Sequence, residues 1–468
     1  MATKKSVRAR PNLLVILIDD LRFDEFGAGG HPYMKTPNID RIAREGATFT
    51  RVFHPTPICS PNRASIVTGQ YASRHGIIDN VARDEMSFRL PNYHLSLQAL
   101  GYETAHIGKW HMGNSAAPRP GYDEWFSFPG HGSLMDPEFN DNGKVVKRTG
   151  YMTDLLNERA LDFVSRKRAK PFSLFLAHKA VHPDAFQAAD GTLDLAAFGG
   201  YRLPPRHEDL YRGEFFAPRP NVMTPAQAAK SKPAFAESVE LKQLPRSKAV
   251  LEAIQSGSQE EIRLRAAMMA SVDEGVGQLL DELTRSGQLD NTVVMFLGDN
   301  GFFFGEHGLG PERRFAYEEG IRSPFLMRYP KRIKAGSVIG RLAMSIDIAP
   351  TLVELAGGKP AATVQGVSLL PLLKDPKAPW RRSILCEYYA ENAMPWLVGM
   401  SYKAVRTDRY KLIHWVNKDG MPGVTDELYD LKEDPYEMRN LIRAKAMAST
   451  VQRLRKELGK LVAQSVGL

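Results

Sequence analysis

The stretch Pro-Ile-Cys-Ser-Pro-Asn-Arg-Ala-Ser-Ile-Val-Thr-Gly, residues 57–69, is the part of the chain around which its other motifs are arranged. It predicts a loop that runs into a helix, because Ser60 is a favourable N-cap and Pro61 suits the first helical position. Cys59 then lies where free backbone N–H groups and the helix dipole favour negative charge. Arg63 follows one turn later on the same face, with a planar fork suited to tetrahedral oxyanions. The stretch therefore indicates a site for a sulfate- or phosphate-like group.

Two apolar runs that are far apart in the sequence both end in side chains that carry oxygen. Residues 13–18 and 292–297 are continuous apolar runs of strand length, as expected for buried parallel strands. The side chains that follow them are Asp19, Asp20, Asp299 and Asn300. Carboxylate and amide oxygens suit a hard divalent cation such as Ca²⁺ or Mg²⁺. Plain turns formed by the same residues are the alternative.

A second motif, Gly-Lys-Trp-His-Met-Gly at residues 108–113, follows a predicted strand over 103–108. In an extended segment Lys109 and His111 project to one face while Trp110 projects to the other. A cation beside an imidazole suits binding an anion and moving a proton. The alternative is a surface lysine next to a packed histidine.

These motifs together resemble the signature of the type I sulfatases, a family of the alkaline phosphatase superfamily. The resemblance rests on Cys-x-Pro-x-Arg with Thr-Gly four residues later, on Gly-Lys-Trp-His-x-Gly, and on the two strand ends. In that family the cysteine is oxidised after translation to Cα-formylglycine (3-oxoalanine), whose hydrate attacks sulfur and later expels sulfate. The resemblance implies one divalent ion, expected to be Ca²⁺ with Mg²⁺ or Mn²⁺ as alternatives. Its implied ligands are Asp19, Asp20, Asp299, Asn300 and the modified Cys59.

The resemblance also implies the remaining catalytic residues. Arg63 and His111 would hold and deprotonate the hydrate, while Lys109, His182 and Arg313 would neutralise charge and assist the leaving group. His182 is chosen because it directly precedes a proline after the predicted strand over 172–180, where His178 is expected to be packed.

Arg313 is a departure from the family pattern. Many relatives have a lysine a few residues before Tyr-Glu-Glu, and that position falls on Arg313 when the chain is aligned back from Tyr317. Arginine keeps the charge but changes the donor geometry, and Arg314 is an alternative for the same role.

Substrate contacts are expected from an irregular insertion over residues 184–258. Its basic residues Arg202, Arg206 and Arg212 are predicted to contact a second anionic or hydroxyl-rich group of the substrate. The alternative is that the segment is a solvent-exposed loop. His307 is expected to reach the metal or sulfate region. Asp24 and Glu25 have no matching role and are expected to be solvated.

The predicted fold is α/β, with a large mixed, mostly parallel sheet flanked by helices. Residues 1–375 are expected to form the catalytic domain. Residues 376–468 are expected to form a smaller α+β subdomain, because short β-like runs precede a charged amphipathic helix over 445–465. The family's small four-stranded antiparallel C-terminal sheet with its helix is what this region resembles.

Composition limits the class and the compartment. The chain has 468 residues, 25% of them charged, and a net charge of +9, which suits an anionic substrate but comes without a nucleic-acid motif. Its first apolar run lacks a cleavage site, and no run is long enough to span a membrane. With two cysteines no disulfide framework is expected, so a cytoplasmic location is predicted.

The expected activity is hydrolysis of a sulfuric ester, which releases inorganic sulfate from a small sulfated alcohol, saccharide or phenol. The expected partners are that small anionic ester and a formylglycine-generating system, without nucleic acid or membrane. A thiolate at Cys59 is favoured by the helix terminus and Arg63, but a thiosulfate adduct would have no easy route to release. The alternatives are a phosphonate monoester or phosphodiester hydrolase with the same site, and a non-catalytic sulfate- or glycan-binding protein if Cys59 stays unmodified.

Overall fold

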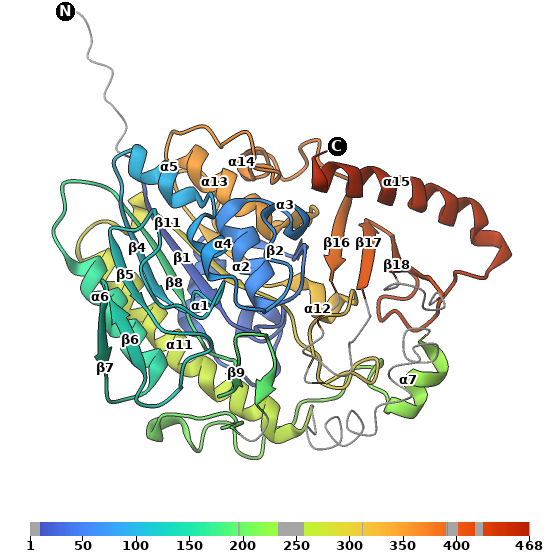
Figure 1. Cartoon of the computed structure of the whole chain (residues 1–468), viewed down its shortest axis with the longest axis horizontal. Coiled ribbons are helices and arrows are strands. Elements are labelled where there is room, and N and C mark those ends of the chain that lie inside the picture. The colour runs from blue at the N-terminus through green and yellow to red at the C-terminus, as the bar shows by residue number, and fades with distance from the viewer. Residues whose placement is uncertain are drawn as a thin grey trace, which may run out of the picture.

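A ten-stranded mixed sheet lies at the centre of the molecule, with helices on both faces (Figure 1). The computed structural model describes residues 10–194, 197–232, 257–310, 312–389, 391, 401–416 and 425–467. The strands at the middle of the sheet are parallel to one another: β11 (Thr292–Gly298), β1 (Asn12–Ile18), β8 (Phe172–Ala177), β4 (Glu103–Gly108) and β5 (Glu124–Ser127). Five strands complete its two edges: β6 (Glu138–Asp141), β7 (Lys144–Lys147), β13 (Phe325–Arg328), β2 (Ala47–Phe49) and β14 (Ser337–Ile339). The predicted α/β class is confirmed.

Strand β1 is buried on both of its faces, which explains its continuous apolar sequence. Alternate residues such as Leu14 and Ile16 enter one core, and Leu13 and Val15 enter the other. The first core is covered by α1 (Pro37–Glu45), α6 (Met152–Ser165) and α11 (Gln259–Arg285). The second core is covered by α2 (Cys59–Thr68), α5 (Tyr93–Ala99) and α13 (Ile348–Leu355). No helix in the described ranges is both long and apolar enough to cross a membrane.

A four-stranded antiparallel sheet with one long helix forms the C-terminal part, at one side of the molecule (Figure 1). Its elements are β16 (Ser383–Tyr388), β17 (Ser401–Thr407), β18 (Tyr410–Val416), β19 (Glu427–Asp430) and α15 (Ala448–Val466). One face packs on α15 through residues such as Leu412 and Leu454. The other face shares a buried aromatic cluster with the large domain, in which Tyr402 and Trp415 lie with Tyr317. The two parts are therefore held together by a common core.

The largely apolar segment over residues 47–53 is divided between two sheets. β2 joins the large sheet, whereas β3 (Val52–Phe53) pairs in a separate three-stranded sheet. An apolar pattern shows that a segment is extended but not which partners it pairs with. Strands β5, β6 and β7, at one end of the large sheet, were also not predicted. Strand β7 is mostly exposed and carries two lysines, so it has no buried apolar run to mark it.

Helix α2 begins two residues earlier than its sequence suggests. Cys59 is its first residue and Ile58 is its N-cap, so the predicted capping role of Ser60 is wrong. The Ser60 hydroxyl instead donates to the backbone oxygen of His111, and the Ser60 N–H donates to Asn80 Oδ1 at 3.1 Å. Gly69 ends the helix in the left-handed region at φ 69°, as its position predicts.

Asp24 and Glu25 are buried, which corrects the expectation that they are solvated. Arg22 Nε lies 2.6 Å from Asp24 Oδ1, and Arg265 Nη2 lies 2.6 Å from Glu25 Oε2. We call the whole ionic group the Arg22 cluster; its members are Arg22, Asp24, Glu25, Arg219, Arg265 and Glu306. Arg22 is local to the two carboxylates, but the other two cations, Arg219 and Arg265, come from positions 195 and 240 residues further along the chain, so local sequence gave no sign of them.

Candidate active site

The predicted catalytic motifs meet at the carboxyl ends of the central parallel strands. Strands β1, β11, β8 and β4 are in close register, with Ile18 opposite Gly298 and Gly108 opposite Ala177. The residues that follow these strands therefore emerge side by side at one edge of the sheet, where ligands bind in open α/β sheets. The first turn of α2 approaches the same edge and brings Cys59 to the residues after β1.

Oxygen-bearing side chains surround the Cys59 thiol. Its Sγ lies 3.5 Å from Asp19 Oδ1 and 4.0 Å from Asp20 Oδ1. Asp299 Oδ1 accepts a hydrogen bond from the Asp20 backbone N–H at 2.9 Å, and Asn300 Nδ2 donates to Asp20 Oδ1 at 2.7 Å. We call these five residues the acidic cluster, and every one of them is buried.

The acidic cluster fits a divalent cation. Asn300 Oδ1 is buried without a hydrogen-bond donor among the described residues, and Asp20 Oδ2 accepts no hydrogen bond there although it has an ion pair with Arg313 at 3.0 Å. A buried oxygen of this kind is costly unless a ligand satisfies it. Asp19, Cys59 and Asp299 each offer a ligand atom, and these atoms lie within 4.8 Å of one another. Burial, together with the neighbouring Asp19 carboxylate, raises the pKa of Asp299 to about 7. Several buried carboxylates with orphaned oxygens are the donor set that a hard cation prefers.

Three cations line the acidic cluster. The Lys109 ammonium contacts Asp19, Arg63 Nε donates to Asp299 Oδ2 at 2.8 Å, and Arg313 Nη1 lies 3.0 Å from Asp20 Oδ2. Burial alone would raise the pKa of Asp19, but the charges of Lys109 and Arg63 outweigh it and hold the pKa well below its usual value. The site therefore combines carboxylates for a metal with cations for an anionic group.

Arg313, and not Arg314, is the arginine that faces the acidic cluster. Arg314 Nη1 lies 3.0 Å from Glu312 Oε1, and its Nε contacts Glu391. Arg314 is thus committed to an ionic network outside the site. The catalytic role of Arg313 stays a prediction, now supported by its position.

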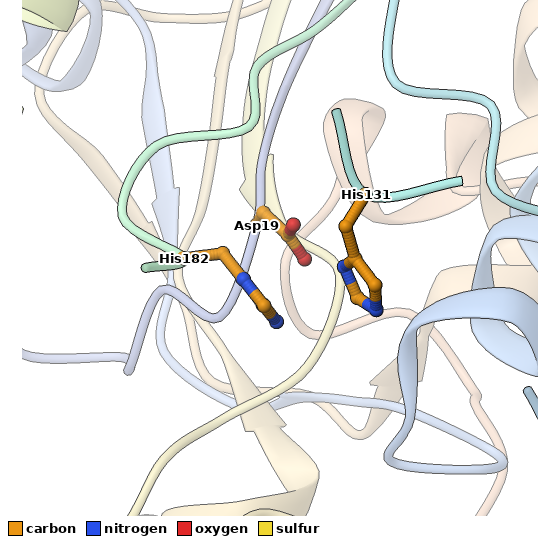
Figure 2. A group of neighbouring side chains, drawn as sticks. All are labelled: Asp19, His131 and His182. Atoms are coloured by element: carbon orange, nitrogen blue, oxygen red, sulfur yellow. The ribbon is translucent and has the colours of Figure 1, made fainter. Parts of the chain in front are cut away.

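Three buried imidazoles stand beside Asp19. His131 and His182 lie on two sides of its carboxylate (Figure 2), with ring centroids 4.5 Å apart and planes inclined by 24°. The ring of His111 lies 4.1 Å from that of His131. Burial, reinforced by the charge of Lys109, lowers the pKa of all three well below the usual value, so they are neutral.

Sequence reasoning missed His131. It lies in the loop after β5, a short strand that was not predicted, and the only local sign was a histidine between Gly130 and Gly132. Asp19, His131 and His182 have the spacing of a three-ligand metal site. However, the Lys109 ammonium lies 3.1 Å from His131 Nδ1 and also contacts Asp19, so it already occupies that position.

Two other histidines lie in different surroundings. His178 is fully buried, burial lowers its pKa to about 3, and the packed position expected for it is confirmed. His307 stacks on Tyr317 at 4.1 Å, and its Nε2 lies 3.4 Å from Glu319 Oε2 and 3.1 Å from Asn221 Nδ2. These contacts place His307 beside the shared aromatic cluster, and its predicted role in substrate binding gains no support from them.

The three insertion arginines have different partners. Arg206 pairs with Asp154 and Glu274 at 2.7 Å, and Arg212 pairs with Asp209 at 2.7 Å. Arg202 is 55% exposed at its side chain and lies 3.6 Å from Asp184, two residues after His182. Arg202 is therefore the one linked most directly to the site. Residues 195–196 and 233–256 of the predicted insertion lie outside the described residues.

The Cys59 thiol is not poised as a thiolate. Burial and the nearby Asp19 carboxylate raise its pKa well above the usual value, despite the opposing charges of Lys109 and Arg313. The expectation that the helix terminus and Arg63 favour a thiolate is therefore wrong. The helix dipole is weak beside the desolvation of a fully buried thiol next to a carboxylate.

Two sequence families match the chain. The family described as Sulfatase matches residues 11–358, and the family described as N-sulphoglucosamine sulphohydrolase, C-terminal, matches residues 305–464. An N-acetylglucosamine-6-O-sulfatase of Bacteroides thetaiotaomicron is 32% identical, over 94% of this chain and 84% of that protein. An arylsulfatase of Clostridium perfringens is 27% identical, over 96% of this chain and 94% of that protein.

Solved structures share the fold over nearly the whole length. One, in complex with its substrate D-glucosamine-2-N,6-O-disulfate, superposes with a TM-score of 0.82 at 28% identity and covers 98% of both chains. A phosphonate monoester hydrolase of Agrobacterium radiobacter has a TM-score of 0.75 at 20% identity, over 97% of this chain and 96% of that chain. The second likeness concerns the fold alone.

Proposed function

The chain belongs to the sulfatase family and is a sulfuric ester hydrolase, and we propose that its substrate is a small glucosamine-type saccharide sulfated on O6. The observation that carries the proposal is the meeting of Cys59, the acidic cluster and three cations at one point of the sheet edge. The substrate class is suggested by the names of the N-acetylglucosamine-6-O-sulfatase and of the glucosamine disulfate complex.

We propose that Asp19, Asp20, Asp299 and Asn300 hold Ca²⁺ together with residue 59. The unpartnered Asn300 Oδ1, together with Asp20 Oδ2, whose one charged partner is Arg313, supports this assignment, because a hard cation would be coordinated by both oxygens. A bound divalent ion supplies Lewis-acid polarisation of the sulfate oxygens.

We propose that residue 59 acts as formylglycine, formed from Cys59 by a formylglycine-generating system. The raised pKa of the thiol supports this, because a protonated thiol is a poor nucleophile. In the modified form residue 59 would supply a geminal hydroxyl pair, of which one hydroxyl could displace the alcohol from sulfur and the other could re-form the aldehyde as sulfate leaves.

The remaining catalytic roles are assigned to three charged side chains and one neutral imidazole. Lys109 and Arg313 lie against Asp19 and Asp20 and would neutralise the negative charge of the sulfate group in the transition state. Arg63, fixed by its bond to Asp299, would orient residue 59 from the next turn of α2. His111, neutral in its buried position, would accept the proton of the attacking hydroxyl.

His182 would contact the leaving-group oxygen after taking up a second proton on Nε2, because only a protonated nitrogen could donate to that oxygen. Its Nδ1 lies 2.8 Å from the Pro183 carbonyl oxygen, which can only accept a hydrogen bond, so Nδ1 carries the proton. Its Nε2 faces the acidic cluster at 3.9 Å from Asp20 Oδ2. Arg202 beside Asp184 is the insertion arginine that we propose for contact with the saccharide.

The test is a substrate panel assayed with Ca²⁺ for release of inorganic sulfate. The panel contains N-acetylglucosamine 6-sulfate, glucosamine 6-sulfate, N-acetylgalactosamine 6-sulfate, an aryl sulfate and an aryl phosphonate. We expect the two glucosamine esters to have the highest kcat/KM and Cys59→Ser to be folded but nearly inactive. Faster turnover of the phosphonate than of every sulfate would replace the proposal with a phosphonate monoester hydrolase. Binding without turnover by protein that carries unmodified Cys59 would indicate a sulfate- or glycan-binding protein.

A further inference from the structure

We propose that Gln187 is a positioning residue that fixes His111 and His131 in one tautomer through a single carboxamide oxygen. Gln187 lies in β9 (Phe186–Gln187), a short strand that pairs with β10 (Leu193–Asp194) at the start of the insertion. The inference rests on the proposed function, because it concerns how the proton acceptor of that reaction is prepared.

Both imidazoles point the same ring nitrogen at the Gln187 carboxamide. His131 Nε2 lies 2.9 Å from Gln187 Oε1, and His111 Nε2 lies 3.2 Å from the same atom. The side chain is only 7% exposed, so water does not compete for this oxygen. An amide oxygen has two lone pairs and can accept two hydrogen bonds.

The hairpin settles which end of the carboxamide faces the imidazoles. Gln187 Nε2 donates to the backbone oxygen of Gly191 at 2.7 Å, across the turn between β9 and β10. If the amide were reversed, its oxygen would face the Gly191 oxygen, and two acceptors would meet without a hydrogen atom between them. The oxygen therefore faces His111 and His131, and each of these rings must carry its proton on Nε2.

This tautomer leaves Nδ1 of each ring as the acceptor. For His131, Nδ1 accepts a hydrogen bond from Lys109. The Lys109 Nζ lies 3.1 Å from this nitrogen, and an ammonium group can only donate. Lys109 thereby gives one hydrogen bond to His131 and one to Asp19, and keeps its third N–H for an anion. The orientation of Lys109 is thus tied to Gln187 through His131.

For His111, the acceptor nitrogen Nδ1 is directed at α2, the helix that begins with Cys59. Its Nδ1 lies 3.5 Å from Ser60 Oγ, and the Ser60 hydroxyl is already used on the backbone oxygen of His111. Nδ1 therefore faces the first turn of α2 with its lone pair free to accept a proton. In the other tautomer this nitrogen would carry a hydrogen atom and could not act as a base.

A purely structural role for Gln187, as an anchor of its hairpin, makes different predictions. The hairpin is also held by its turn, where Asp190 Oδ1 accepts from the backbone N–H of Thr192 at 2.9 Å. Asp190 is exposed and outside the site, so it provides a matched control in the same hairpin. Gln187→Met keeps the length and volume of the side chain but removes both the acceptor oxygen and the donor.

The experiment combines kinetics with ¹⁵N NMR of histidine-labelled protein, in which the tautomer of each ring is read from its two nitrogen shifts. For Gln187→Met we expect kcat on the best substrate of the panel to fall about tenfold, with KM changed less than about twofold. We also expect the pure Nε2–H signature of His111 and His131 to be lost. Asp190→Ala should keep both the kinetics and the signature.

Wild-type kcat in Gln187→Met, or an unchanged Nε2–H signature in that variant, would overturn the proposal. Equal losses in Gln187→Met and Asp190→Ala would also overturn it, because they would show that only the hairpin matters. The NMR readout needs no turnover, so the tautomer assignment stays testable even if every ester of the panel fails. Failure of the panel with an intact signature would count against the proposed substrate and not against the role of Gln187.

Discussion

The acidic cluster and the Arg22 cluster are both buried next to the end of β1, but their charged groups are satisfied to different degrees. In the Arg22 cluster, Arg22 uses all three of its nitrogens on Asp24 and Glu306, and both oxygens of Glu25 accept from Arg265. In the acidic cluster, Asp20 Oδ2 and Asn300 Oδ1 accept no hydrogen bond from the described residues.

The difference separates structural charge from functional charge. A buried ionic group whose carboxylate oxygens all accept hydrogen bonds contributes to the packing of the fold, even where one nitrogen, here Arg265 Nη1, has no partner among the described residues. Removing one of its cations leaves an uncompensated charge. A buried group with orphaned oxygens is unfavourable in isolation and is retained where a ligand completes it. The Arg22 cluster is of the first kind and the acidic cluster is of the second.

Asp299→Ala should break the acidic cluster with the largest effect on turnover. We expect sulfate release to fall by about 10,000-fold, because the loss of a metal ligand removes several kcal/mol of transition-state stabilisation. The rise of the thermal midpoint on adding Ca²⁺ should disappear in this variant. Glu25→Gln in the Arg22 cluster is the control and should keep its Ca²⁺ response. Full wild-type activity after exhaustive chelation of divalent metal ions would contradict the metal-dependent account.

Arg22→Met, in contrast, should lower the stability of the fold much more than it lowers turnover. We expect a loss of about 3–5 kcal/mol in the free energy of unfolding, because Asp24 and Glu306 would remain buried with Arg219 as their one cation. Sulfate release per folded molecule should change far less than in Asp299→Ala. Arg285→Gln, which breaks an exposed pair with Glu282, should leave the urea midpoint unchanged. A stable but inactive Arg22→Met protein would show that the two clusters are not separable.

Arg313→Lys and Arg314→Lys should distinguish the two neighbouring arginines. Arg313 borders the acidic cluster, so we expect Arg313→Lys to lower kcat about tenfold, because a lysine keeps the charge but loses the planar fork. Arg314→Lys should lower the thermal midpoint with little change in kcat, because Arg314 is bound to Glu312 and Glu391. The reverse assignment of losses would move the family's lysine position to Arg314.

The smallest expected effect is that of Asp273→Asn on the pH dependence of stability. It tests how the pKa of a buried carboxylate responds when its hydrogen-bond partners are N–H groups. It accepts hydrogen bonds from the Asn38 and Ile39 backbone N–H groups at 3.0 and 2.8 Å, yet burial raises its pKa to about 6. A raised carboxyl pKa favours the folded state at low pH, and this contribution is lost as pH rises through about 6. Between pH 5 and 7.5 the free energy of unfolding of wild type should therefore fall by about 1 kcal/mol relative to Asp273→Asn. Parallel pH curves from urea unfolding would refute the assignment.

The sequence predicted the central part of the fold well for a physical reason. Strands buried on both faces must be continuously apolar, so β1, β8 and β11 were visible as runs that end within three residues of their observed ends. The motifs that follow such strands were therefore placed correctly at one edge of the sheet. Glycine at position 69 likewise marked the end of α2 through its left-handed conformation.

What the sequence did not show depends on contacts between distant segments. His131 follows a four-residue strand, and Gln187 reaches the site from a two-residue strand, so neither belongs to a periodic pattern. The burial of Asp24 and Glu25 depends on arginines that lie on α11 and in the insertion. The sequence likewise could not show which of Arg313 and Arg314 faces the site. Both lie in irregular backbone, where no helical or strand periodicity determines the direction of a side chain.

The central claim is that sulfate-ester hydrolysis in this protein depends on a modified residue 59. The most direct measurement pairs peptide mass spectrometry of residue 59 with sulfate release, across preparations that differ in their degree of conversion. The account predicts that turnover rises in proportion to the formylglycine fraction and reaches zero where residue 59 is entirely cysteine. Full turnover from protein whose residue 59 is entirely unmodified cysteine would contradict it.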